Sequence, residues 1–170
     1  MALAAALVSL AAFAGERPAD KMMADATKPT IGETLSPALQ TDGVIRVRSA
    51  YPLEETIARI KQDIAAKGIK FFDEIDQTKL GGDAGIKLRP STLLIFGNPP
   101  LGIQFLASNP NAGLDWPVRL LAMQDDKGDV YAAYTDFAWI AQRHGITDRE
   151  AQFKMASSVV SSILSTVTAK

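Results

Sequence analysis

The chain has no cysteine and only one histidine among its 170 residues, and these two deficits exclude many kinds of site. Without cysteine it forms no disulfide, thiolate zinc site, iron–sulfur cluster or covalent haem attachment, and it has no cysteine nucleophile. A single histidine excludes sites that take two imidazoles from one chain, as most catalytic zinc sites do. Oxygen-ligand chemistry, carboxylate acid–base catalysis or plain binding remain, and we predict no metal site and no cofactor.

An excess of either charge is also lacking, because 18 Lys and Arg residues stand against 19 Asp and Glu residues. A net charge of −1 offers no basic excess to neutralise phosphates, so we expect no nucleic acid partner. A chain of this length typically buries about 70% of its unfolded surface, which suffices for one self-sufficient core.

The chain has no hydrophobic run long enough to cross a membrane, which takes roughly 20 apolar residues. Residues 1–14 are apolar or small and end in Ala12-Phe13-Ala14, like the hydrophobic and cleavage regions of a secretory signal peptide without a basic start. We expect this segment to be removed and the protein to be periplasmic or secreted, with no transmembrane anchor. An ordinary Ala-rich helix is the alternative, and a protein whose N-terminus is not cleaved would be cytoplasmic.

The composition divides the rest of the chain into two parts. Residues 15–42 carry prolines, glycine and scattered charge without an apolar period, so we predict a flexible linker. Residues 43–170 show the periodic patterns of a single α/β domain. Alternating or continuous apolar runs predict strands at 44–49, 69–76, 93–96, 118–124 and 130–135. Stripes at helical spacing predict helices at 52–67, 100–108, 137–144 and 147–168, and residues 77–90 are expected to be a loop or weak helix.

This order of elements predicts an α/β fold of the α+β type. We expect a single mixed sheet of about five strands covered by helices, with a βαβ or split βαβ start, a β-hairpin and a C-terminal helix. The run at 93–96 is apolar throughout and is our candidate for a central strand.

One polar turn follows the predicted central strand directly, at Gly97-Asn98-Pro99-Pro100. Ligands of open α/β sheets tend to bind at the carboxyl ends of strands, so Asn98 is a candidate ligand-binding residue. The spacing is not that of a phosphate-binding P-loop, and a tight turn is the alternative. Arg89, just before the strand, could reach the carboxylate of Asp76 or Asp136.

Two acidic groups invite a metal or acid–base interpretation. Glu74 and Asp76 point to the same face of a predicted strand, and Asp125 to Asp129 form an acidic turn. A solvated edge strand and an ordinary hairpin turn explain both groups with fewer assumptions. Asp136 is expected to cap the helix at 137–144. Thr147-Asp148-Arg149-Glu150 has the spacing of a capping box, so Thr147 is expected to cap the last helix.

Several spaced motifs resemble those of DUF302, a family of domains of unknown function found in bacteria and archaea. They are Asp76, the run 88–99, Leu114-Asp115-Trp116-Pro117, Tyr134-Thr135-Asp136 and Arg143-His144-Gly145, and the resemblance covers residues 44–145. It implies a compact α/β domain that is often a homodimer, and it names no activity. Members often carry Ile-Asp-His where this chain has Ile75-Asp76-Gln77, so a site made of two histidines is not available here.

Three hypotheses of function follow. The first is an exported, non-catalytic domain that binds a small ligand or a partner protein, with the ligand near Arg89, Asn98, Asp136 and His144. The second is an enzyme of unknown reaction with Asp76 or Asp136 as base and His144 as acid. The third is a dimeric scaffold that docks through the helix at 147–168. Since His144 is expected at a helix C-terminus before Gly145, we favour a structural role for it.

Overall fold

The computed structural model describes residues 42–168, so the predicted signal peptide and nearly all of the predicted linker lie outside the described residues. Its strands are β1 (Val44–Arg48), β2 (Lys70–Asp76), β3 (Ser91–Gly97), β4 (Val118–Gln124) and β5 (Val130–Thr135). Its helices are α1 (Leu53–Ala66), α2 (Gln77–Asp83), α3 (Pro99–Ser108), α4 (Phe137–Arg143) and α5 (Glu150–Ser165), with a 3₁₀ helix η2 (Pro110–Leu114).

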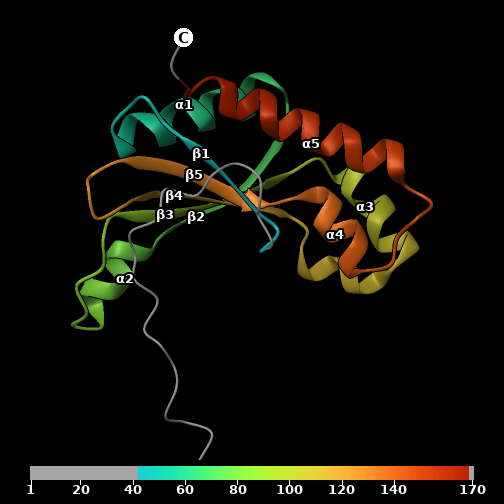
Figure 1. Ribbon diagram of the computed structural model, residues 1–170, viewed down its shortest axis with the longest axis horizontal. Helices are drawn as coiled ribbons and strands as arrows, with labels where there is room; N and C mark the ends of the chain where they lie inside the picture. The colour runs from blue at the N-terminus through green and yellow to red at the C-terminus, as the bar shows by residue number, and fades with distance from the viewer. Residues whose placement is uncertain (1–41, 169–170) are drawn as a thin grey trace, which may run out of the picture. The chain divides into compact units, whose positions relative to one another are not determined.

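The five strands form one sheet in the order β1-β5-β4-β3-β2 (Figure 1). The α/β class and the single five-stranded sheet are therefore confirmed, but the sheet is not mixed: every neighbouring pair is antiparallel. The reason lies in β1 and β2, which flank α1 and run in the same direction but occupy opposite edges of the sheet. The strand expected to be central, β3, is second from one edge, and β4 is central.

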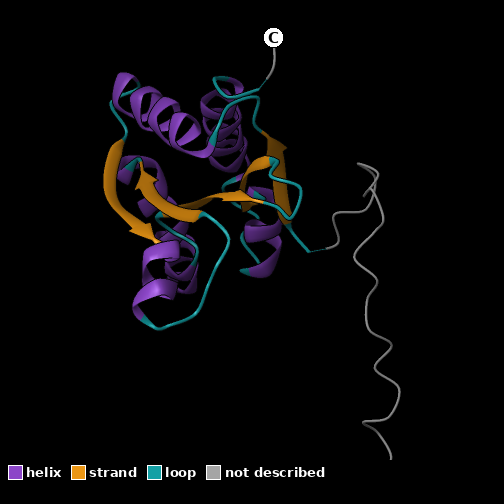
Figure 2. Ribbon diagram, turned by 90° about the vertical axis from the view of Figure 1, so that its left-hand side faces the viewer, coloured by secondary structure: helices purple, strands orange, loops and turns teal. Residues whose placement is uncertain are grey.

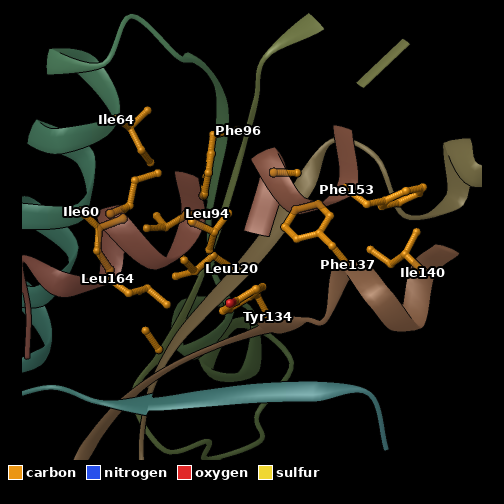
Figure 3. Packing of buried hydrophobic residues seen from close by; sticks show 14 of the residues in the cluster. Ile60, Ile64, Leu94, Phe96, Leu120, Tyr134, Phe137, Ile140, Phe153 and Leu164 are labelled. Atoms are coloured by element: carbon orange, nitrogen blue, oxygen red, sulfur yellow. The ribbon is translucent and has the colours of Figure 1, made fainter. Parts of the chain in front are cut away.

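One face of the sheet carries the core beneath α1 and α5, which lie on the same side of the sheet (Figures 1 and 2). Helix α1 turns Ile60 and Ile64 inward at four-residue spacing, and both are essentially inaccessible. Figure 3 shows these side chains beside Leu94, Leu120 and Leu164. Burying such a side chain fully stabilises the fold by about 1.5–3 kcal/mol.

Helix α5 supplies the other half of this core, as its apolar stripe predicts. The buried residues of the helix are Phe153, Ala156, Val160, Ile163 and Leu164. Because these side chains pack inside the domain, the helix does not offer the free apolar surface that docking through residues 147–168 would need.

Most helix ends follow the expected signals. Gly68 and Gly145 adopt φ of +63° and +60° just after α1 and α4, a conformation that glycine tolerates and other residues rarely adopt. The expected cap of α5 is different: the helix begins at Glu150 with Arg149 at the N-cap, and no side chain caps it. No helix within residues 42–168 is long and apolar enough to cross a membrane.

Candidate functional site

Three loops meet at one end of the sheet because the strands alternate in direction. Strand β3 ends there at Gly97, β4 begins there at Val118, and β5 ends there at Thr135. Asn98, Trp116 and Asp136 lie in these loops, so the structure brings together two of the predicted site residues. Helices α3 and α4 lie beyond this end of the sheet (Figure 1).

His144 lies at the same end, at the C-cap of α4, and its side chain is only 5% exposed. Its Nε2 is 2.6 Å from Oδ2 of Asp115, whose side chain is 3% exposed. Nη1 of Arg143 donates to both carboxylate oxygens of Asp115 at 3.2 and 3.1 Å, and Nη2 of Arg119 donates to Oδ1 at 3.2 Å. We call these four residues the Asp115 cluster.

The Asp115 cluster joins two segments that are far apart in the sequence, so its role is to hold the fold together. It links the loop before β4 to the C-terminal end of α4, and the side-chain amide of Asn109 also donates to the carbonyl of His144 at 2.8 Å. The imidazole is enclosed and its Nε2 already pairs with a carboxylate, so His144 is poorly placed to exchange protons with a substrate. The second hypothesis therefore loses support for its proposed acid.

Asp115 is the residue that reasoning from the sequence missed. Its Leu-Asp-Trp-Pro motif and the Arg-His-Gly motif were both noted, but nothing in one sequence indicated that the two motifs meet. Their shared place in the family pattern was the only available signal.

Asp136 has the capping role expected of it. Its Oδ1 accepts a hydrogen bond from the backbone N–H of Ala138 at 3.0 Å, at the start of α4. Burial of the Tyr134 side chain raises the pKa of its hydroxyl above the usual 10.0, and the negative charge of Asp136 adds to this shift. Asp136 thus organises the backbone at this end of the sheet.

Asn98 stands at the N-cap of α3, but its side chain makes no capping hydrogen bond. Its carbonyl accepts from the backbone N–H of Gly102 at 2.9 Å. The residue lines a cavity of about 140 Å³ between β3, α3 and α5, which also touches Trp116. Of the four predicted ligand-binding residues, Asn98 is the one that lines this cavity.

Arg89 lies two residues before β3, at the other end of the strand from Asn98, and the strand alone spans roughly 20 Å by its rise per residue. It pairs with Asp126 in the β4–β5 turn, not with Asp76 or Asp136, and both side chains are more than 60% exposed, at 62% and 65%. Asp76 caps α2 by accepting from the backbone N–H of Lys79 at 2.9 Å. Arg89 therefore does not share a site with Asn98, Asp136 and His144.

The second face of the sheet has an apolar centre and, in the described part of the chain, carries none of the long helices. The side chains at the centre of this second face alternate along the strands with those that face the core, and all of them are at least partly sheltered from solvent. They are Ile75, Leu93, Ile95, Leu121, Met123, Tyr131 and Ala133. Arg46, Arg48, Asp73 and Arg119 stand on the same face. We call this surface the open sheet face. Antiparallel sheets with one free face usually carry polar residues there, so this composition is unusual.

Residues 77–90 form an arm beside the open sheet face. Its helix, α2, lies across the sheet from α1 and α5 in both views, and the Oγ1 of Thr78 accepts from the backbone N–H of Ser91 at 2.9 Å (Figures 1 and 2). Leu80, Ile86 and Leu88 of this arm are 56%, 59% and 43% exposed. The arm therefore extends the apolar surface of the sheet.

Comparisons with known proteins agree on the fold. The model of the family described as "Domain of unknown function DUF302" matches residues 45–163. The crystal structure of an uncharacterized conserved DUF302 protein from Bacillus stearothermophilus superposes with a TM-score of 0.67 at 16% identity. That superposition covers 74% of this chain and 98% of the other, and at this identity it supports the fold alone.

Curated relatives are similar over part of their length. The fluoride-specific ion channel FluC 1 of Brucella suis biovar 1 is 36% identical over 104 residues, which are 61% of this chain and 41% of that protein. The FluC 1 protein of Brucella abortus biovar 1 has the same identity over 38% of its length. The chain thus spans about two fifths of the curated relatives it matches.

Proposed function

The chain belongs to the DUF302 family, and from this membership and the open sheet face we propose that it is a non-catalytic binding domain. The observation that carries the proposal is an apolar sheet face that none of the long helices within residues 42–168 covers, on a domain whose core is already complete on the other side. Contiguous apolar surface that stays partly accessible to solvent marks interaction sites in soluble proteins. The enclosed imidazole of His144 supports the non-catalytic part.

We propose a second copy of the chain as the occupant of the open sheet face. The face has an apolar centre and charged residues toward its edges, which is the anatomy of many protein interfaces. Three rows of side chains across the strands span on the order of 500 Å², from strand spacing and rise. A standard interface buries about 800 Å² per partner, so the exposed leucines and isoleucine of the arm would supply most of the remainder.

Sedimentation velocity of the full chain over a range of concentrations tests this association. Leu121 lies in the middle row with Leu93 and Ala133 as cross-strand neighbours, so L121R places a charge at the centre of the face. We expect the native chain to sediment as a dimer and L121R as a monomer. The matched control is I103R, which makes the same kind of change at a 52% exposed position on α3 and should stay dimeric.

A second variant separates loss of association from loss of folding. Leu80→Ser with Leu88→Ser removes exposed apolar contacts of the arm without touching the sheet, and we expect weaker dimerisation with an unchanged circular dichroism spectrum. A native chain that remains monomeric at every concentration would overturn the homodimer proposal.

The binding function includes a small ligand at the Asn98 end of the sheet. The support is the cavity beside Asn98, at the end of the sheet where Asp136 caps α4 and the imidazole of His144 pairs with Asp115. The channel relatives make fluoride one ligand to test. The walls of the cavity are mainly apolar and cannot replace the water around a small anion, so we expect sodium fluoride to leave the melting temperature of the protein unchanged.

We also propose that the domain acts outside the cytoplasm, as the signal-peptide-like residues 1–14 suggest. Mass spectrometry of protein recovered from cells tests this. A mature N-terminus close to Gly15 is the expected result, and a protein that retains Met1 would contradict it.

A further inference from the structure

We propose that the cavity beside Asn98 binds a small carboxylate with an apolar body of about the size of a benzene ring. This inference deepens the small-ligand part of the proposed function and is independent of self-association. The cavity lies between α3, α5 and the end of β3, remote from the open sheet face. Its volume is about 140 Å³.

The walls of the cavity are mainly aromatic and aliphatic. Phe96 and Phe137 come from the core, Val159 and Val160 from α5, and Leu101 from α3. An apolar cavity of about 150 Å³ in another protein accepts benzene, whereas drug-sized ligands occupy cavities of about 300 Å³ or more. The size therefore selects a single ring or a short branched chain.

Trp116 forms a rigid side of the cavity because its indole packs directly against the backbone of two glycines, which have no Cβ atom in the way. A Cβ atom built on Gly102 would lie 1.8 Å from Nε1 of Trp116, and one on Gly97 would lie 3.2 Å from the same atom. Phe72 meets the indole edge-on, with ring centroids 6.1 Å apart. A flat ligand group in the cavity would therefore lie against a fixed aromatic surface.

The polar groups of the cavity set the sign of the ligand's charge. Among residues 42–168, Lys67 is the one charged residue that lines it, and its Nζ is 2.6 Å from the carboxylate of Asp63, whose side chain is 18% exposed. The side-chain amide of Asn98 is not used in capping α3. Lys67 and Asn98 both line the cavity, so a ligand carboxylate at its mouth would share the Lys67 ammonium with Asp63 and accept from the Asn98 amide, with the apolar part of the ligand inside.

The experiment uses three probes of nearly equal shape: phenylacetate, its neutral amide and the cation phenethylamine. Binding is followed by isothermal titration and by quenching of Trp116 fluorescence in the full chain carrying W139F, which leaves one tryptophan. We expect phenylacetate to bind at least tenfold more tightly than the amide and phenethylamine not to bind. A branched-chain carboxylate such as isovalerate serves as the non-aromatic probe.

Two variants link the binding to the cavity. Ala156→Leu fills it from α5 and should abolish binding, while the matched control Ala151→Leu on an exposed position of the same helix should not. Lys67→Met should remove the preference for the acid over the amide and leave amide binding unchanged. Thermal unfolding of each variant verifies that it folds.

The outcomes are decisive in either direction. Equal affinities for acid and amide in the native chain would overturn the carboxylate assignment, and so would a preference that survives K67M. Binding that persists in A156L, or failure of every probe to bind a folded chain, would overturn the site itself. A monomeric chain that binds phenylacetate would refute only the homodimer proposal.

Discussion

Replacing Asp115 by alanine tests the view that the Asp115 cluster is structural. The change removes the carboxylate that pairs with Nε2 of His144 at 2.6 Å and with the guanidinium groups of Arg119 and Arg143. An enclosed polar group left without its partner costs about 1–3 kcal/mol. The two arginine side chains are each 50% exposed and regain water, so losing each pair costs at most about 1 kcal/mol.

Together these contributions predict a loss of roughly 3 kcal/mol in the free energy of unfolding of D115A. For a folded part of this size that corresponds to a fall in melting temperature of about 10 °C. Urea unfolding followed by tryptophan fluorescence measures the first quantity and calorimetry the second. Asp115→Asn keeps one acceptor for the imidazole, so we expect an intermediate loss.

Asp126→Ala is the matched control for D115A, because it breaks an ion pair whose two side chains are both largely exposed. Exposed pairs contribute about 0.2–1 kcal/mol, so D126A should unfold nearly like the native chain. Equal effects of D115A and D126A would refute the assignment of a structural role to the cluster.

Two further predictions concern the same end of the sheet. Since burial raises the pKa of Tyr134 above 10.0, its neutral hydroxyl favours the folded state fully below pH 10.0, and this contribution is lost as the pH rises through the higher pKa of the folded protein. The free energy of unfolding should therefore fall more steeply above pH 10.0 in the native chain than in Y134F, and parallel curves would contradict the prediction. Asp136→Ala removes the acceptor for the N–H of Ala138 and should cost about 1 kcal/mol in urea unfolding. Asp83→Ala, which breaks only an exposed i,i+4 pair with Lys79, is its control, and equal losses would argue against the cap.

Local signals in the sequence predicted most of the elements. The turn at Asp125 to Gly128 placed the hairpin of β4 and β5, and Asp136 and Gly145 bounded α4. These features depend on contacts between residues close in the chain, which a single sequence displays directly. The prediction that Thr147 caps the last helix was wrong. The spacing from Thr147 to Glu150 is that of a capping box, but α5 begins only at Glu150, so Arg149 occupies the N-cap position.

Contacts between residues far apart in the chain could not be predicted from local patterns in the sequence. The apolar run at 93–96 indicated a strand in the sheet interior, but which strands would flank it depends on where β1 pairs. The site shows the same limit: Asn98 and Asp136 were placed correctly at strand ends, whereas Asp115 and His144 are 29 residues apart and meet only in the fold. Arg89 was assigned to the wrong partners for two reasons. The direction of β3 places it at the opposite end of the sheet from Asp136, and at its own end, where Asp76 also lies, it pairs instead with Asp126 of the β4–β5 turn.

The position of β1 at the edge beside β5 has a consequence for how the chain folds. Strands β2 to β5 follow one another as neighbours, so their ladders close over short stretches of chain, whereas β1 pairs Val44 with Thr135 across almost the whole domain. Closing so long a loop costs entropy that only the finished ladder returns. We therefore expect β1 to join last, and weakened β1–β5 pairing to accelerate unfolding more than it slows folding.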